Sequence, residues 1–279
     1  MKTLILSSNN GGGHNAVAHA LKVCFESHGD SCEIRDSLSF LSENFSEFVS
    51  RSHTYMYRHA PELFDAGIRR SERKPKQFRE HHSTRNIIDL GRFSLGHYLQ
   101  SEGFDCVICT HVFAAMMLTA AIRQYHLSLR TALVETDYAN TPGCADNDME
   151  LHFLPSESLI PERIAMGVDA DKLVVSGIPV RQDILVKTDR AEAKRDLGLA
   201  PEHKHVLLMG GSMGGGPIGE LAEHLATLLD KDVDLSVVCG NNDLLLRELS
   251  DDLGGYDNVH LHGLEKNISL LMDSADLLI

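Results

Sequence analysis

Short apolar runs alternate with segments of helical periodicity along the first 176 residues. Apolar runs bounded by turn residues are typical of buried strands, and apolar positions three or four apart are typical of helices. The expected strands cover 3–7, 32–35, 104–109 and 130–135, and the expected helices follow the glycines at 11–13 or cover 38–65, 86–99 and 112–122. Strands and helices in alternation, with short connections, predict a parallel sheet covered on both faces.

The second part of the chain repeats this order. The run 173–181 leaves through Gly177 and a proline, which predicts a hinge between two domains, 1–176 and 177–279. The expected elements are strands at 205–209, 235–239, 259–264 and 275–279 and helices over 217–229 and 267–272. Because a buried parallel strand needs a further loop, helix or neighbouring strand beside it, the apolar strand at the end leads us to expect that the second domain is incomplete.

Chemistry-bearing residues come directly after several of the predicted strands. The carboxyl ends of parallel strands meet at one edge, where ligands gather in open α/β sheets. Gly11–His14, Thr110-His111 and Thr136-Asp137 would all lie on that edge. A glycine loop leading into a helix presents backbone N–H groups and the positive end of the helix to negative charge. At that position the dipole disfavours an imidazolium, so His14 is expected to be a neutral ring that can accept a proton.

The first glycine loop alone leaves three interpretations open. Gly11-x-Gly13-x-x-Ala16, with Asp36 after a second strand, satisfies a relaxed dinucleotide-binding fingerprint. The loop is also typical of a site where a histidine acts on a substrate, and of a simple turn. The second loop, 210–216, comes between a strand and a helix in the same way, but it lacks the Gly-Lys-Ser/Thr of a phosphate-binding P-loop.

Composition and charge exclude several kinds of protein. With 43% hydrophobic and 24% charged residues the chain is globular, and its net charge of −14 argues against a general nucleic-acid binder. We find no apolar run long enough for a membrane span and no secretory signal, which predicts a soluble, cytoplasmic protein. The six cysteines, including Cys106 and Cys109 within one predicted strand, are expected to be free thiols.

Residues 38–85 differ from the rest of the chain. The helical part carries scattered apolar residues, Phe48 and Tyr55 among them, which we expect to anchor it to the core. The basic segment 69–85 comes next and has seven Lys/Arg (69, 70, 73, 74, 76, 79 and 85) against Glu72 and Glu80, a net +5 that leaves −19 for the remainder. Such a segment suits an anionic lipid surface, and a solvated loop explains it equally well.

A set of motifs occurs in one order along the whole chain: Gly11-Gly-Gly-His14, Thr136-Asp137-Tyr138, Phe153-Leu-Pro-Ser156, Gly177-Ile-Pro-Val-Arg181, Gly210-Gly-Ser-Met-Gly214 and Leu271-Met-x-x-Ala-Asp276. Together they resemble the monogalactosyldiacylglycerol synthase and processive diacylglycerol glucosyltransferase family, which is related to the N-acetylglucosaminyltransferase of the peptidoglycan lipid precursor. The resemblance implies a GT-B fold, in which two Rossmann-like domains face each other across a cleft.

The resemblance also implies roles for residues at matching positions. His14 corresponds to the base that deprotonates the acceptor hydroxyl, Asp137 to the family's Thr-Asp-Phe aspartate, and Gly12, Gly13 and His111 lie on the acceptor side. The implied donor-nucleotide residues are Arg181, Ser212, Met213 and Gly214, with Gly240, Asn241 and Leu264 beside the uracil and ribose. The family's next motif, a Pro-Gly-Gly loop that holds sugar and ribose hydroxyls, is expected after Ile279.

The resemblance therefore predicts an inverting hexosyltransferase that makes a membrane glycolipid. It would move glucose or galactose from UDP-glucose or UDP-galactose to diacylglycerol, with no metal or cofactor, as a peripheral protein on the cytoplasmic face of the membrane. The basic segment 69–85, with Phe64 and Phe78, would meet the lipid surface. Three alternatives stay open: transfer of N-acetylglucosamine to a peptidoglycan lipid precursor, a nicotinamide-dependent oxidoreductase, and a non-catalytic binding fragment.

Overall fold

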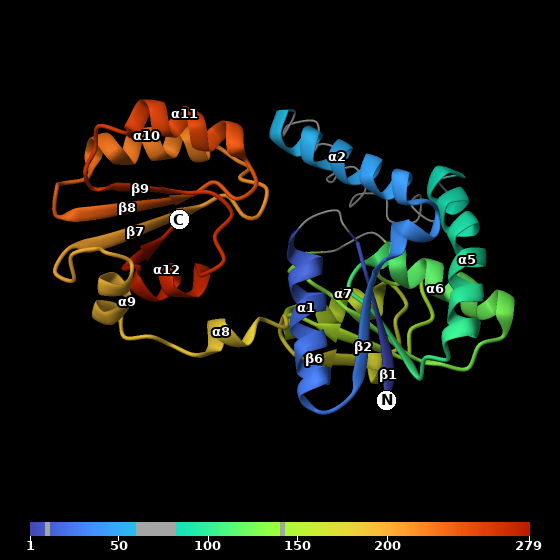
Figure 1. Ribbon diagram of the computed structural model, residues 1–279. Coiled ribbons are helices and arrows are strands. Elements are labelled where there is room, and N and C mark those ends of the chain that lie inside the picture. Colours follow the sequence, from blue (N-terminus) through green and yellow to red (C-terminus); the bar gives the residue numbers. More distant parts are fainter. Residues whose placement is uncertain (9–11, 60–81, 140–142) are drawn as a thin grey trace. The chain divides into compact units, whose positions relative to one another are not determined.

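A computed structural model describes residues 1–8, 12–59, 82–139 and 143–279 (Figure 1). The chain divides into two compact units, Met1–Arg181 and Gln182–Ile279. The sequence predicts a boundary between residues 176 and 177, five residues before the division between the two units. The Gly177-Ile-Pro-Val-Arg181 stretch therefore belongs to the first unit.

The first unit is built on one six-stranded parallel sheet in the order β2-β1-β3-β4-β5-β6. The strands are β1 (Lys2–Ser7), β2 (Ser31–Asp36), β3 (Cys106–Cys109), β4 (Arg130–Val134), β5 (Leu151–Leu154) and β6 (Leu173–Val175). β1 lies inside the sheet, with Ile5 in register with Ile34 on one side and Ile108 on the other. Leu4, Ile5 and Leu6 are fully buried, because a strand covered on both faces needs continuous apolar sequence.

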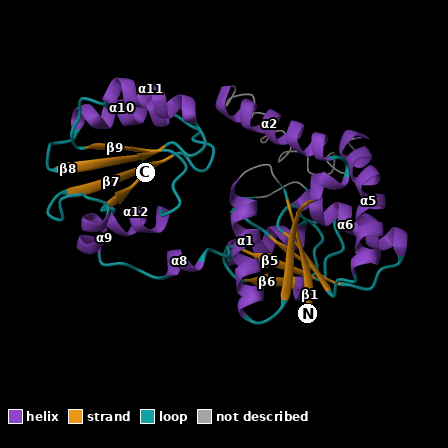
Figure 2. Ribbon diagram, in the orientation of Figure 1, coloured by secondary structure: helices purple, strands orange, loops and turns teal. Residues whose placement is uncertain are grey.

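Helices cover both faces of this sheet (Figure 2). The helical elements are α1 (Gly12–Ser27), η1 (Ser37–Phe40), α2 (Glu43–His59), α5 (His82–Glu102), α6 (Val112–Tyr125), η2 (Glu157–Leu159), α7 (Ile160–Ala165) and η3 (Ala170–Lys172). α1 packs Val17 and Ala18 against Ile5 on one face. α5 and α6 pack against the other face, where Leu95 and Met117 join Leu4 and Leu6 in a second core cluster.

The first unit differs from the sequence prediction in the helical segment that follows β2. The expected helix 38–65 begins as the short helix η1, capped by the Asp36 carboxylate on the Leu38 amide at 3.1 Å, and α2 follows over Glu43–His59. Positions 60–65 of the expected helix lie outside the described residues. Phe48 and Tyr55 are each 66% exposed, so the expectation that they anchor α2 to the core is wrong. Apolar spacing on a mostly polar helix does not say which way the helix faces.

The expected lipid-facing residues mostly lie outside the described part of the chain. Residues 60–81 are not described, and they include Phe64, Phe78 and most of the basic segment 69–85. Only the backbone at 82–85 is described, as the first turn of α5. Among the described helices, none is both long and apolar enough to cross a bilayer.

The second unit contains a four-stranded parallel sheet in the order β10-β7-β8-β9. Its strands are β7 (Lys204–Met209), β8 (Val233–Val238), β9 (Val259–His262) and β10 (Leu277–Leu278), and its helices are α8 (Gln182–Leu185), α9 (Arg190–Asp196), α10 (Ile218–Leu228), α11 (Asp243–Leu253) and α12 (Ile268–Ser274). Ala222 of α10 and Leu249 of α11 cover one face of the sheet beside Leu208. Leu271 of α12 covers the other face beside Leu207.

All six cysteines are unpaired. Burial raises the pKa of Cys106 and Cys109, and it raises the pKa of Cys32 to about 11. These three thiols therefore stay protonated at neutral pH, which suits packing and not nucleophilic chemistry.

Candidate active site

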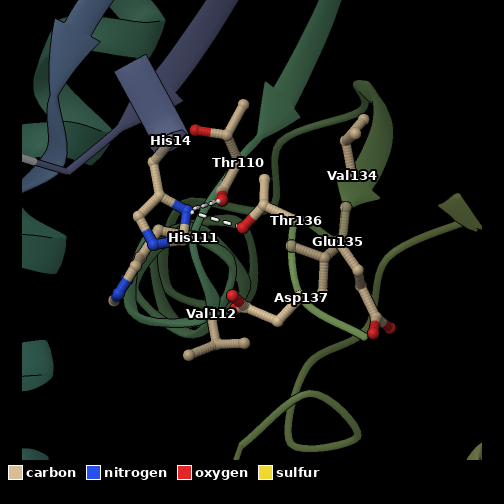
Figure 3. Close-up of a pocket in the computed structure, with 9 residues that line it drawn as sticks. His14, Thr110, His111, Val112, Val134, Glu135, Thr136 and Asp137 are labelled. Carbon is tan, nitrogen blue, oxygen red and sulfur yellow. Dashed lines mark hydrogen bonds between the residues drawn. The ribbon is translucent and has the colours of Figure 1, made fainter. Parts of the chain in front are cut away.

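A pocket lies where the topology of the first sheet changes direction. From β1 the chain moves to β2 on one side, whereas β3 pairs on the other side of β1. Loops at such a switch point diverge and leave a crevice at the carboxyl ends of the strands. The pocket there encloses about 330 Å³, part of it open to solvent (Figure 3). Its lining comprises His14, Thr110, His111, Val112, Leu133, Val134, Glu135, Thr136 and Asp137.

His14, in the first turn of α1, is held in one tautomer by its neighbours. Its Nδ1 lies 2.7 Å from the Thr110 carbonyl oxygen and 3.0 Å from Thr136 Oγ1 (Figure 3). A carbonyl oxygen only accepts hydrogen bonds, so Nδ1 must carry the proton and donate it. In the neutral ring, Nε2 then holds the lone pair, which makes it the nitrogen that can take a proton from a substrate.

His111 caps the next helix along the same edge. Its Nδ1 accepts a hydrogen bond of 3.2 Å from the Phe113 amide at the start of α6. The imidazole stacks on the Phe113 ring at 5.1 Å and meets the His14 ring edge-on, with centroids 4.7 Å apart and an interplanar angle of 85°. The residue singled out from the sequence for the acceptor side is thus packed directly against the candidate base.

The loop after β4 supplies the remaining polar side chains of the pocket. In Figure 3 the Asp137 carboxyl points toward the two imidazoles, whereas the Glu135 carboxyl points away from His14. Thr136 lies between them and contacts His14. The structure therefore brings His14, Thr110-His111 and Thr136-Asp137 together at one edge of the sheet, as the sequence predicts.

A buried arginine holds the Glu135 carboxylate in place. Arg163 of α7 is fully buried and donates from Nε to both Glu135 carboxyl oxygens, at 3.1 and 3.0 Å, and from Nη2 to Oε2 at 2.5 Å. Burial by itself would raise the pKa of Glu135, but the His152 imidazole and the Arg163 guanidinium outweigh it and lower that pKa. Sequence reasoning missed this pair, because an acid after a strand and an arginine in a short helix look like surface residues.

Two glycines form the start of α1, directly before His14. Gly12 begins the helix, and a Cβ built on Gly13 meets nothing within 4 Å. Ser7 at the end of β1 ties the same turn down through a 2.6 Å hydrogen bond to Asn15. Gly13 is therefore not required by packing within the described part of the chain.

In the second unit, two loops at the carboxyl edge of the sheet interlock. Gly214 has φ +56°, and a Cβ there would lie 2.0 Å from the Cys239 carbonyl oxygen. Gly240 has φ +57°, and a Cβ there would lie 2.6 Å from the Ser212 carbonyl oxygen. Only glycine combines this backbone conformation with such close approach. The Asn241 amide donates to the Ser212 carbonyl at 2.9 Å, which closes the contact.

The sequence-predicted donor residues of this unit therefore gather at one edge. Asn242, which sequence reasoning did not assign to the site, donates from Nδ2 to the Gly214 carbonyl at 3.1 Å and caps α11. Leu264 is 63% exposed after β9, next to Gly263, whose own Cβ position would lie 3.9 Å from the Gly240 carbonyl oxygen. Met213 lies in the same glycine loop. Arg181 is the last residue of the first unit.

Within the described residues, no cluster of His, Cys, Asp and Glu has the arrangement of a metal site. Asp148 accepts a hydrogen bond of 2.6 Å from Arg123. His260 pairs with Asp234 at 3.1 Å, and His262 lies 3.6 Å from Glu265, so the two histidines of β9 have separate partners.

Comparison with known proteins identifies the family. The family described as monogalactosyldiacylglycerol (MGDG) synthase matches residues 14–180. The chain is 26% identical over 259 residues to a processive diacylglycerol beta-glucosyltransferase of Bacillus pumilus, covering 90% of this chain and 64% of that protein. It is 25% identical over 298 residues to the chloroplastic monogalactosyldiacylglycerol synthase of Spinacia oleracea, covering 100% of this chain and 55% of that protein.

The fold has a counterpart among solved structures. MurG of Acinetobacter baumannii superposes with a TM-score of 0.57 at 14% identity, covering 100% of this chain and 73% of that one. This likeness shows the GT-B fold, whereas the family match rests on sequence. The chain spans less than two thirds of the length of the two sequence relatives. By its sequence, the chain belongs to the monogalactosyldiacylglycerol synthase family.

Proposed function

We propose that the protein transfers a hexose, glucose or galactose, from a uridine diphosphate donor to diacylglycerol, with inversion at the sugar carbon. Family membership and the names of its relatives support the reaction class. The single observation that carries the proposal is the His14 tautomer. Its Nδ1 proton is committed to the Thr110 carbonyl, so Nε2 is the proton acceptor in the pocket.

The chemistry is one displacement at the anomeric carbon. The acceptor hydroxyl gives its proton to His14 Nε2 while its oxygen forms the bond to the sugar, and the bond from the sugar to the diphosphate oxygen breaks. A single displacement inverts the configuration. The imidazolium that forms keeps its hydrogen bonds to Thr110 and Thr136, and the Asp137 carboxylate in the same pocket favours the positive charge.

The second unit supplies the donor side of this proposal. Pro217 at the start of α10 offers no side-chain cap, so the amide groups of the first turn are left for an anionic ligand. Ser212, Met213 and Gly214 precede that helix and would hold the diphosphate together with Arg181. Further residues would lie beside the uracil and ribose, namely Gly240, Asn241 and Leu264. Charge on the leaving group is then taken up by backbone dipoles and an arginine, with no metal or cofactor.

The acceptor is a lipid, so we place the reaction at a membrane surface, on the cytoplasmic face. α2, with its exposed Phe48, Tyr55 and Met56, leads directly into the undescribed stretch that holds most of the basic segment 69–85. Apolar side chains next to basic ones are typical of peripheral binding to anionic lipid.

The test is a transfer assay with UDP-glucose and UDP-galactose offered separately, and with diacylglycerol in mixed micelles as acceptor. The 279-residue chain and the product of the whole open reading frame are compared. Glycolipid from one donor supports the proposal and identifies the sugar. Folded protein that makes no glycolipid from either donor contradicts it, and transfer of N-acetylglucosamine to a peptidoglycan lipid precursor becomes the reaction to assay.

A further inference from the structure

Four backbone carbonyls of the glycine loop 210–216 accept hydrogen bonds from within the second unit. Three of the donors are backbone amides, at 2.9 to 3.2 Å, in the pairs Gly215 to Gly210, Gly214 to Gly211 and Asn241 to Ser212. The fourth donor is a side chain, because Asn242 Nδ2 donates to the Gly214 carbonyl at 3.1 Å. Any residue supplies a backbone amide, so the fourth bond is the one that depends on the residue type.

These bonds fix the peptide group between Gly214 and Gly215 at both ends. Its carbonyl oxygen accepts from Asn242, and its N–H donates to the Gly210 carbonyl. Glycine has no Cβ to oppose rotation, and Gly214 already has φ +56°, so the local backbone offers little resistance to a flip of this peptide. Because the C=O and N–H of a trans peptide point in opposite directions, a flip would set the Gly214 carbonyl against the Gly210 carbonyl. The loop would then have to open.

We propose that Asn242 is a positioning residue that keeps the glycine loop in its diphosphate-binding form. This rests on the proposed function, which assigns the diphosphate of the donor to the loop 210–216. Phosphates are bound by backbone N–H groups, and carbonyl oxygens repel phosphate oxygens, so such a loop has to keep its carbonyls engaged with the protein. Asn242 does this through the Gly214 carbonyl and not through a contact of its own with the ligand.

The same side chain also caps α11, and the two roles can be separated by substitution. Asn242 Oδ1 accepts a hydrogen bond of 3.3 Å from the Leu245 amide. Serine and aspartate are as effective as asparagine at the N-cap of a helix, but neither carries the NH₂ group that holds the Gly214 carbonyl. Asn242→Ser is neutral and its hydroxyl is one bond shorter. Asn242→Asp places a carboxylate against that carbonyl.

The loop 239–242, between β8 and α11, has further bonds that these substitutions leave in place. The Asn242 amide donates to the Cys239 carbonyl at 3.1 Å, and the Asn242 carbonyl accepts from the Leu246 amide at 3.0 Å. The proposed function places the uracil and ribose beside this loop. Loss of the Asn242 side-chain bond should therefore weaken binding of the diphosphate and spare binding of the nucleoside.

Asn258, at the opposite edge of the same sheet, offers a matched control. It precedes β9, and its Nδ2 donates to the backbone carbonyls of Val233 and Asp230 at 2.8 and 3.3 Å. Because β8 and β9 are parallel, their starts lie away from the loops that follow the strand ends. Asn258→Ser removes the same kind of bond, so it should lower the melting temperature without changing the affinity for UDP.

Titration calorimetry on the full-length protein measures the affinity for UDP directly and the affinity for uridine by displacement of UDP. We expect N242S to bind UDP about threefold to tenfold more weakly, the value of one hydrogen bond, with uridine affinity and melting temperature unchanged. N242D should lose more, because its carboxylate repels both the Gly214 carbonyl and the diphosphate. N258S should bind both ligands as the unchanged protein does.

Two results would overturn the inference. If N242S and N242D bind UDP as tightly as the unchanged protein, Asn242 serves only as the cap of α11. If they lose affinity for UDP and uridine by the same factor, the substitution damages the second unit as a whole and does not act on the diphosphate. An unchanged protein that binds neither ligand contradicts the donor side of the proposed function itself, and the inference fails with it.

Discussion

Arg163 and Glu135 form a buried ion pair in which the guanidinium contacts both carboxyl oxygens. Glu135 belongs to the loop that contacts His14, the candidate base. The guanidinium reaches both carboxyl oxygens of Glu135 and also the Ala139 carbonyl at 3.3 Å, so it holds the loop on either side of Thr136. Thr136 in turn contacts His14. The position of the base thus depends on a charge pair whose carboxylate points away from it.

Removing one member of this pair should destabilise the first unit strongly. Arg163→Met leaves the Glu135 carboxylate buried without its partner, which typically costs about 3–5 kcal/mol. The double variant Arg163→Met/Glu135→Gln should recover part of that loss, since no charge is then left uncompensated. Urea unfolding of the single and double variants measures both. A single variant as stable as the unchanged protein would contradict the ion-pair interpretation.

The Thr136 hydroxyl should contribute to the rate through its contact with His14. Thr136→Val removes the oxygen and keeps the shape, and we expect a fall in kcat of about threefold to tenfold, the value of one neutral hydrogen bond. Thr136→Ser keeps the oxygen and is the matched control. Steady-state rates with saturating donor compare the two variants. Equal rates for valine and serine would show that the contact makes no contribution to the rate.

The glycine loops of the second unit should be intolerant of side chains. Gly214→Ala places a methyl group 2.0 Å from the Cys239 carbonyl oxygen in a left-handed conformation, so the two loops must separate. We expect loss of UDP binding, measured by calorimetry, together with a lower melting temperature. Gly13→Ala is the contrasting variant: its methyl group meets nothing within 4 Å among the residues that the structure describes, and it should leave the melting temperature unchanged or higher. Destabilisation by G13A would contradict the packing.

Asp276 should stabilise the second unit in a pH-dependent way. Burial by itself raises its pKa, but hydrogen bonds from Lys194 and from the His205 amide outweigh this, and the pKa falls to about 2 from 3.8. The folded state therefore binds fewer protons than the unfolded state. Its contribution, about 2 kcal/mol, is present above pH 4 and is lost as the pH falls toward 2.

Asp276→Asn should accordingly lower the free energy of unfolding by about 2 kcal/mol at pH 7 and by much less near pH 2. Denaturant titrations at several pH values measure the difference between the two proteins. Asn in place of the exposed Asp257 is the control and should be neutral. A stability difference that does not shrink on acidification would contradict the assigned cause.

Sequence periodicity predicts an element well when burial dictates its residues. β1 is predictable because a strand inside a parallel sheet must read Leu4-Ile-Leu6 without interruption. β5 is visible in the sequence only as part of a motif, because the strand Leu151–Leu154 is short and carries His152, whose burial beside Glu135 only the fold reveals. The large apolar side chain of Phe48 suggests a place in the core, but Phe48 lies on an exposed face of α2.

The same distinction holds for the site. His14 and Asp137 could be placed together because strand ends share one edge of a parallel sheet. The hydrogen bond between His14 and Thr110 could not be predicted, because its acceptor is a backbone carbonyl that any residue would supply. Arg163 could not either, because its partner lies 28 positions away and only the fold brings them within reach.

The most direct test of the central claim is the single-turnover rate of sugar transfer to diacylglycerol by His14→Ala and by His19→Ala, a matched change at an exposed histidine of the same helix. General-base catalysis typically contributes about 10²–10⁴-fold. We predict a loss in that range for H14A, with folding intact, and a near-unchanged rate for H19A. Retention of the full rate by H14A would contradict the assignment of His14 as the base.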